Sequence, residues 1–104
     1  MARILCAGVA VMDFIFQVDE MPVRAEKYRA RDAAIAGGGC AANAAVAIAR
    51  QGGRALLATR LGSDPVGDMI IADLENEQVD TAFVNRSPGG KSSFSSVYVD
   101  SGGE

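Results

Sequence analysis

The chain begins with a continuous apolar run from Ile4 to Val9, which ends at a glycine and a turn. Such a run predicts a central strand of a parallel sheet, covered on both faces. Asp13 comes just past the end of this strand, and in open α/β sheets ligands bind beyond the carboxyl ends of the strands. Asp13 is therefore a candidate ligand-binding residue, although a turn or capping aspartate would also account for it.

The next two segments predict a short pair of strands. Residues 14–18 are rich in β-prone side chains and are ended by residues 19–22, whereas residues 28–35 alternate loosely, with Lys27 beside their start. A simple nucleotide-binding βαβ unit passes directly from its first strand to its first helix. The inserted pair is therefore predicted to form a flap over the ligand site.

Three glycines, residues 37–39, precede an alanine-rich helical pattern over residues 41–51, which Gly52 and Gly53 end. A ligand can lie against such a helix start, because its first N–H groups lack partners and the macrodipole is positive there. Asn43, one turn into the helix, offers both a donor and an acceptor, as recognition of a sugar hydroxyl requires. A tight turn before a closely packed helix is the simpler alternative.

The second half of the pattern continues an α/β arrangement. Residues 54–60 predict a strand parallel to the first. Asp64 and Pro65 predict the N-cap and first residue of a helix through residue 76, with Asp73, Glu75 and Glu77 on its solvated side. Further strands are predicted at residues 79–84 and 93–100, separated by a loop at 87–90. The last strand leads into a hairpin turn with no returning strand, so we expect the front part of a longer protein.

Composition narrows the classes of partner. The 104 residues, 49% of them hydrophobic, are enough for one small globular domain. The net charge of −3 and the scattered basic residues argue against nucleic acid or a membrane as partner and favour a small molecule or another protein. Two cysteines do not resemble a secreted disulfide framework, which favours the cytoplasm. The chain has no histidine, so His-based zinc sites and Ser-His or Cys-His catalytic pairs are excluded within it.

Two nucleotide-binding motifs are only partly matched. Gly90-Lys91-Ser92 resembles the end of a phosphate-binding loop, but Asn85 stands where that motif needs its first glycine, and no helix pattern follows. Residues 8–13 likewise lack the second and third glycines of the dinucleotide fingerprint. Neither motif predicts a nucleotide site in this chain.

Seven residues spread over 25 positions fall at the spacings of a known signature, namely Gly38, Gly39, Ala41, Asn43, Ala45, Gly52 and Gly62. The chain thereby resembles the ribokinase-like (PfkB) carbohydrate kinases, and the likeness continues through residues 62–67, 78–81 and 97–104. The resemblance implies the α/β class, as the N-terminal part of a doubly wound parallel sheet with the strands of a small lid inserted. The core would comprise about residues 1–12 and 36–85, and the lid strands about residues 13–35 and 91–100.

The resemblance also implies an ATP-dependent sugar kinase that uses Mg²⁺. Asp13 and Asn43 would hold sugar hydroxyls, with the backbone of Gly39 and Gly38 beside them. The family's catalytic aspartate, its anion hole and its nucleotide pocket belong to the C-terminal half, so no catalytic, cofactor-binding or metal-binding residue is expected in this segment. Since phosphoryl transfer depends on positioning and charge neutralisation, the segment alone should be inactive.

Within the family, residues 11–13, 26–28 and 91–93 look most like kinases of ketohexose derivatives, sulfofructose in particular. Lys27 would then pair with an anionic group of the substrate, or remain a solvated surface lysine. Ser95 and Val97, on the last predicted strand, would cover the sugar. Ribokinases proper carry lysine where this chain has Cys40, which counts against ribose; the thiol is either reactive at the helix start or a buried filler.

Two alternatives share these sequence features. A nucleoside kinase of the same fold has the same signature and differs in the lid. A stand-alone binding or dimerisation module would use the lid strands without catalysis. In either case the exposed strand edges of the lid need covering, which predicts a homodimer through the lid.

Overall fold

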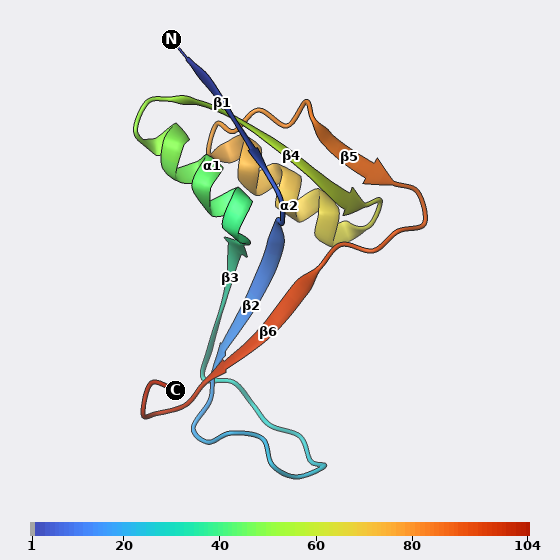
Figure 1. Ribbon diagram of the computed structural model, residues 1–104. Coiled ribbons are helices and arrows are strands. Elements are labelled where there is room, and N and C mark those ends of the chain that lie inside the picture. The colour runs from blue at the N-terminus through green and yellow to red at the C-terminus, as the bar shows by residue number, and fades with distance from the viewer. Residues whose placement is uncertain (1) are drawn as a thin grey trace.

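The computed structural model describes residues 2–104, which form two three-stranded sheets and two helices. The parallel core sheet, in the order β1-β4-β5, comprises β1 (Arg3–Ala7), β4 (Arg54–Gly62) and β5 (Val84–Ser87). The lid sheet, in the order β3-β2-β6, comprises β2 (Val11–Gln17), β3 (Asp32–Gly38) and β6 (Phe94–Val99). The helices are α1 (Cys40–Arg50) and α2 (Pro65–Asn76). Figure 1 shows the lid sheet extending away from the core, which confirms the predicted α/β architecture with inserted lid strands.

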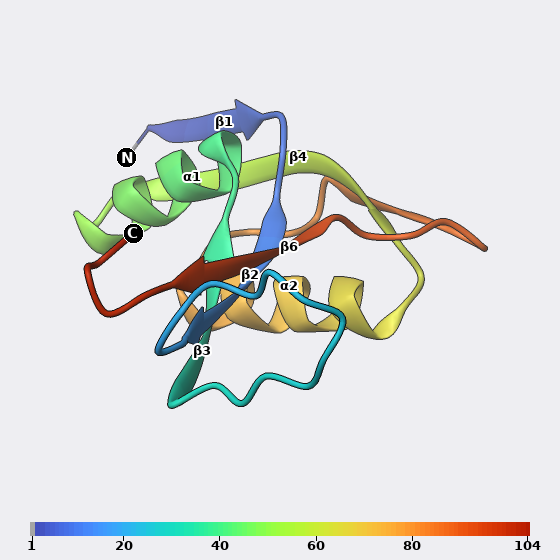
Figure 2. The ribbon, with the colours of Figure 1, turned by 90° about the horizontal axis from the view of Figure 1, so that it is seen from below.

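Both helices lie on one face of the core sheet, where the hydrophobic core forms (Figure 2). Helix α1 turns Ala41, Ala42 and Ala45 toward the sheet, and their small side chains let the helix backbone approach closely. Leu57 of β4 and Leu74 of α2 are fully buried in the same cluster. Helix α2 has its predicted extent, and α1 begins and ends one residue before the predicted range of 41–51. Within residues 2–104, neither helix is long and apolar enough to cross a bilayer.

The first strand differs from the sequence prediction. β1 forms the edge of the core sheet, paired only with β4, and the side chains of Ile4 and Leu5 are 45% and 57% exposed. The prediction of a central strand covered on both faces over Ile4 to Val9 is therefore wrong for the described chain. The apolar run reflects the composition of a covered strand, but burial of both faces needs helices on both faces, whereas α1 and α2 lie on one face and β1 is at the edge of the sheet.

The strand predicted at residues 79–84 is also misplaced. Asp80 makes a single parallel bridge with Leu56, and its carboxylate then accepts a 2.9 Å hydrogen bond from the N–H of Ala82, which turns the chain. Pairing with β4 resumes only at Val84, in β5. The local turn therefore delays the strand, because an aspartate side chain that bonds to nearby backbone competes with the sheet ladder.

The glycine run is part of a strand rather than a loop. Gly37 and Gly38 end β3, where they pair with Met12 and Val11 of β2 in an antiparallel register that continues to Gln17 and Asp32. Of the three glycines in the run, Gly39 alone has a left-handed backbone, with φ 96°, directly before α1. The lid sheet therefore includes residues 11–12 and 36–38, which the sequence placed in the core. The predicted strand at residues 93–100 is confirmed as β6.

Candidate functional site

Asp13 lies in the middle strand of the lid sheet, with Ala36 of β3 on one side and Ser95 of β6 on the other. The Ser95 hydroxyl donates a 2.6 Å hydrogen bond to Oδ1 of Asp13. The other oxygen, Oδ2, lies above Gly38, because a Cβ atom on that glycine would come within 2.6 Å of it. The structure thus brings three of the predicted site residues together, with one carboxylate oxygen held by the lid and the other beside the glycine backbone.

The start of α1 adjoins this carboxylate. Gly39 has a backbone that L side chains rarely adopt, and a Cβ atom there would collide with the carbonyl group of Val9. No side chain caps the helix at Gly39, and among the first N–H groups of α1 that of Ala42 donates a 3.3 Å hydrogen bond to the Val9 carbonyl oxygen. Asn43, whose N–H donates to the Gly39 carbonyl over 2.8 Å, is exposed one turn into the helix.

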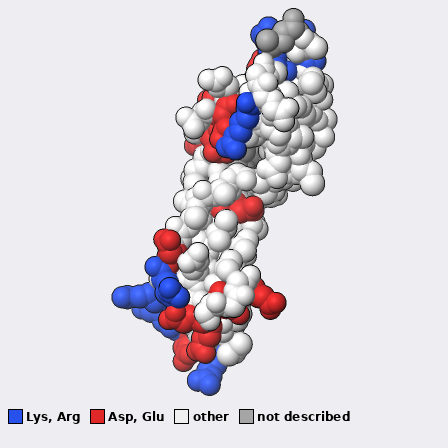
Figure 3. All heavy atoms as spheres, turned by 90° about the vertical axis from the view of Figure 1, so that its left-hand side faces the viewer, with Lys and Arg blue, Asp and Glu red and all other residues white. Residues whose placement is uncertain are grey.

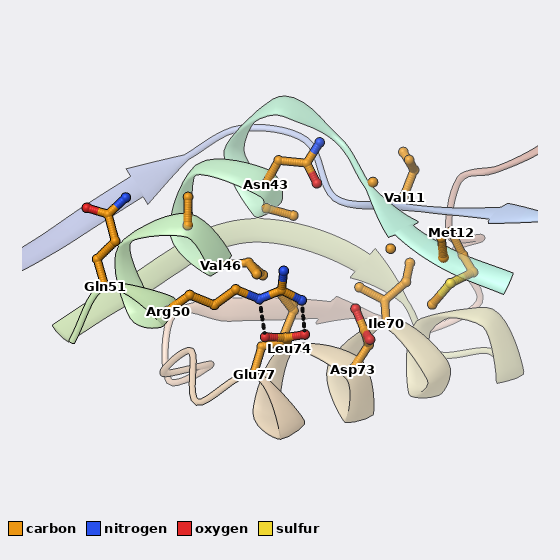
Figure 4. A pocket seen from close by; sticks show the side chains of 15 residues that line it. Val11, Met12, Asn43, Val46, Arg50, Gln51, Ile70, Asp73, Leu74 and Glu77 are labelled. Atoms are coloured by element: carbon orange, nitrogen blue, oxygen red, sulfur yellow. Dashed lines mark hydrogen bonds and ion pairs between the residues drawn. The ribbon is translucent and has the colours of Figure 1, made fainter. Parts of the chain in front are cut away.

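A groove of about 610 Å³ opens beside the glycines, between α1, α2 and the end of β3 (Figure 4). Gly38 and Asn43 line it, and Figure 4 shows the Asn43 carboxamide leaning toward the end where Val11 lies. Val11 and Asp13 are two residues apart on β2 and therefore share a face of the lid sheet. Asp13 itself does not line the groove, and Val11 and Gly38 belong both to the groove and to the surroundings of Asp13.

The sequence did not identify the polar residues on the floor of this groove. The Arg50 guanidinium forms a bidentate ion pair with Glu77, with distances of 2.8 Å from Nε to Oε2 and 2.5 Å from Nη2 to Oε1. The hydrogen bond from Arg50 lowers the pKa of the Glu77 carboxyl, and the same bond raises the pKa of Arg50. The pair joins the C-terminal ends of α1 and α2 and so fixes the spacing of the helices.

Asp73 also lines the groove, and its Oδ2 lies above Gly37. Asp73 and Glu77 are half-buried, whereas the sequence prediction placed both on the solvated side of α2; only Glu75 is exposed there. The helical spacing of four residues between the two acids was a usable signal, because it puts them on the same face. What the spacing does not reveal is that Gly37 of the lid sheet lies against Asp73 and that Arg50 of α1 pairs with Glu77.

Two predicted residues lie farther along the lid. Val97 is two positions beyond Ser95 on β6 and pairs with Ile15, so it extends the face that carries Asp13 away from the helices. Lys27 is exposed in the loop between β2 and β3, which Figure 1 shows at the opposite end of the lid from α1. Figure 3 shows charged side chains of both signs gathered at that end. Within this chain, Lys27 is not brought next to Asp13.

The two cysteines are both free. Cys40 is exposed as the first residue of α1, next to Gly39, whereas Cys6 is half-buried in β1. Of the two alternatives for Cys40, the buried filler is wrong. Its thiol is accessible at the helix start, close to the glycines that line the site.

The chain is similar in sequence and in fold to several known proteins. A sequence profile described as pfkB family carbohydrate kinase matches residues 1–104. An ATP-dependent ribose-1-phosphate kinase from Halopiger xanaduensis is 34% identical over 104 residues, which are 100% of this chain and 35% of the relative. The crystal structure of fructokinase from Vibrio cholerae O395 is 36% identical, with a TM-score of 0.76 over 100% of this chain and 32% of that one. Ribokinase from Cryptococcus neoformans var. grubii, crystallised with ADP, is 25% identical, with a TM-score of 0.80 over 100% and 32% of the two chains.

The fold and the profile together define the class: the chain belongs to the pfkB family of carbohydrate kinases, which are phosphotransferases. The resemblance drawn from the signature residues is thereby confirmed. The chain spans about a third of the length of the curated relatives that it matches.

Proposed function

We propose that this chain is the sugar-binding part of an ATP-dependent kinase that phosphorylates a hydroxyl group of a sugar or sugar derivative. The observation that carries the proposal is the Asp13 carboxylate, held by Ser95 through one oxygen and placed beside Gly38 at the start of α1. The second oxygen has no hydrogen-bond partner among residues 2–104, which suits it to accept a hydrogen bond from a substrate hydroxyl.

The neighbouring groups complement this acceptor. Asn43 can donate and accept at the same time, and the N–H groups of Cys40 and Ala41, the first two residues of α1, offer further donors to hydroxyl oxygens. A polyol presents several hydroxyl groups, each of which both donates and accepts, so a site that mixes acceptors with donors is suited to it. By orienting the sugar, these residues would align one hydroxyl group with the phosphate to be transferred.

ATP is the proposed phosphate donor, with Mg²⁺ to neutralise its phosphates. The name of the Halopiger relative and the ADP in the Cryptococcus ribokinase support this assignment. We propose that the nucleotide site, the metal and the catalytic base belong to the C-terminal half of the kinase, as the family resemblance implies.

A ketohexose type of substrate is our proposal within this class. It rests on the resemblance of residues 11–13, 26–28 and 91–93 to kinases of ketohexose derivatives, and on the exposed Cys40, which stands where the resemblance gives ribokinases proper a lysine. Lys27 lies at the far end of the lid and is proposed to contact an anionic substituent only after the lid loop folds toward the site. The two free thiols support the cytoplasm as the place of action.

A homodimer through the lid is a further part of the proposal. The lid face opposite Asp13 is aromatic: Phe14 and Phe94 pack edge to face and Phe16 and Tyr98 stack, each pair at 5.7 Å between ring centroids. Phe94 is 60% exposed. Exposed aromatic clusters mark interaction sites. A second copy would cover this face, and Phe94→Glu should shift the full-length protein toward the monomer in light scattering, whereas Gln17→Glu on the other face should not.

A thermal-shift panel on the full-length gene product tests the proposal. Ligands that bind the native state raise its melting temperature, so fructose-type sugars and their phosphates should stabilise the protein and nucleosides should not. The Asp13→Asn variant should lose the shift with sugars. Stabilisation by nucleosides alone would assign a nucleoside kinase, and no response to either group would favour a binding module without catalysis.

A further inference from the structure

The segment that leads from the core sheet into the lid is tightly held. Residues 88–93 connect β5 to β6, and Gly90 in this segment packs against Gly62 at the end of β4. A Cβ atom on Gly62 would collide with the Gly90 carbonyl group and lie 2.7 Å from the Cα atom of Lys91. The two backbones therefore touch without an intervening side chain, which only glycine at position 62 allows.

The next residue in the connection, Ser92, is bound by the carboxylate of Asp64. Its N–H donates to Oδ2 of Asp64 over 2.8 Å, and its hydroxyl donates to Oδ1 over 2.7 Å. The same hydroxyl accepts a 3.0 Å hydrogen bond from the N–H of Gly62. Ser92 is the buried polar residue of the described chain, with 7% of its surface exposed, and its hydroxyl is fully partnered. We call Asp64, Ser92 and Gly62 the lid seat.

Helix capping alone does not account for this arrangement. Asp64 is the N-cap of α2, and a cap needs one oxygen, which here is the Oδ1 atom that accepts a 2.8 Å hydrogen bond from the N–H of Gly67. The second oxygen, Oδ2, accepts its hydrogen bond from the N–H of Ser92. A Cβ atom on Gly67 would lie 2.8 Å from the Ser92 hydroxyl oxygen, so this glycine leaves space for Ser92.

Arg86 holds the opposite side of the turn. Its Nε donates to the carbonyl oxygen of Gly62 over 2.9 Å, and its Nη2 forms a 2.8 Å ion pair with Asp68 in the first turn of α2. The turn at residues 62–67 is therefore fixed by groups from β5 and from the connection to β6. The turn at residues 62–67, which the sequence indicates only as a helix start, therefore also binds the segment that leads into the lid.

The seat sets the position at which β6 enters the lid. Directly after Ser92, the carbonyl group of Ser93 accepts a 3.3 Å hydrogen bond from the N–H of Met12, and Ser95 then pairs with Asp13. A shift of one residue in this register would turn Ser95 to the opposite face of the sheet. The hydrogen bond between Ser95 and Asp13 thus depends on where the chain leaves the seat.

We propose that Asp64 and Ser92 are positioning residues of the sugar site: they anchor β6 to the start of α2, so that Ser95 is placed to hold the Asp13 carboxylate. Neither residue contacts the sugar. The effect on substrate binding rests on the proposed function, whereas the anchoring of β6 does not.

Hydrogen–deuterium exchange on the full-length protein tests the anchor without any substrate. Asp64→Ser retains a cap residue but loses the second carboxylate oxygen, and Ser92→Ala removes the hydroxyl group. In both variants the backbone amide hydrogens of β6 should exchange at least about tenfold faster, whereas those of α2 and β4 should exchange at unchanged rates. The reason is that β6 can open locally, with its own free energy, while the rest of the fold stays closed. Asp68→Asn, which alters only the surface partner of Arg86, is the matched control. The double variant should accelerate exchange by less than the product of the two single effects, because the two residues share the hydrogen bond between the Ser92 hydroxyl and Oδ1 of Asp64.

Unchanged exchange in β6, or equal acceleration across α2 and β4, would overturn the anchor and leave only a helix cap. If Asp64→Ser proves too unstable to purify, Asp64→Asn keeps the shape and one acceptor oxygen and makes the same prediction. In kinetics, Ser92→Ala should raise KM for the sugar about tenfold and leave KM for ATP unchanged. If no sugar is phosphorylated by the unmodified protein, the proposed function fails, while the exchange result still decides on the anchor.

Discussion

The Ser95 hydroxyl lies 2.6 Å from Oδ1 of Asp13, although 82 residues separate the two in the chain. β2 lies near the start of the sequence and β6 near its end, and the two pair in the lid sheet. The candidate sugar site is therefore assembled from distant parts of the sequence. The acceptor that would bind the sugar is thereby held in place before the sugar arrives, which lowers the entropic cost of binding.

The charge of Asp13 should matter more than its shape. Asp13→Asn keeps the size of the side chain but replaces a charged acceptor, whose hydrogen bonds contribute about 1.5–3 kcal/mol. In the full-length protein we expect kcat/KM for the sugar to fall about ten- to hundredfold, with KM for ATP unchanged, as measured by steady-state kinetics. Asp32→Asn, an exposed change on the neighbouring strand, is the control. Unaltered sugar kinetics in Asp13→Asn would remove Asp13 from the site.

Two adjacent glycines should respond differently to alanine. In Gly38→Ala the new Cβ atom would lie 2.6 Å from Oδ2 of Asp13, whose carboxylate is tied to Ser95, so the acceptor must be displaced. In Gly37→Ala it would meet only Asp73, an α2 side chain that makes no hydrogen bond among residues 2–104. Gly38→Ala should therefore raise KM for the sugar about tenfold or more, and Gly37→Ala should not. Similar kinetics for the two variants would argue against a sugar site on the Gly38 face.

Cys40 offers a chemical probe of the same site. Its thiol is exposed at the first residue of α1, next to Gly39, whereas Cys6 is half-buried. Bound sugar should slow alkylation of Cys40, measured by intact mass in a Cys6→Ser background, several-fold at saturating concentrations. A labelling rate that does not depend on sugar would place the ligand away from the start of α1.

Acid should weaken the lid seat. The hydrogen bonds from the Ser92 N–H and hydroxyl, together with that from the Gly67 N–H, lower the pKa of the Asp64 carboxyl below its usual value of about 4. A carboxyl with a lowered folded-state pKa stabilises the fold fully above its unfolded-state pKa, and this stabilisation is lost as pH falls through the folded-state value. Urea unfolding should therefore show Asp64→Asn less stable than the unmodified protein at pH 6, with the gap closing toward pH 3. A gap that stays constant over this range would contradict the assignment.

The local parts of this structure follow from local residues. The Asp64-Pro65 pair starts α2, the alanine run forms α1, and alternation within residues 93–100 forms β6, because caps, helix propensity and strand alternation act between near neighbours. The spacing of the signature glycines and of Asn43 was likewise enough to indicate the family. For these elements the sequence by itself was sufficient.

Only the tertiary structure decided how those parts meet. Gly37 and Gly38 extend a strand because Met12 and Val11 pair with them, and Ile4 is exposed because β1 lies at the edge of a sheet whose helices cover one face. The contacts of Asp13 with Ser95 and of Asp64 with Ser92 likewise depend on the register of β6. Register and burial depend on residues far apart in the chain, since each strand takes its partners from whichever segment the fold places beside it.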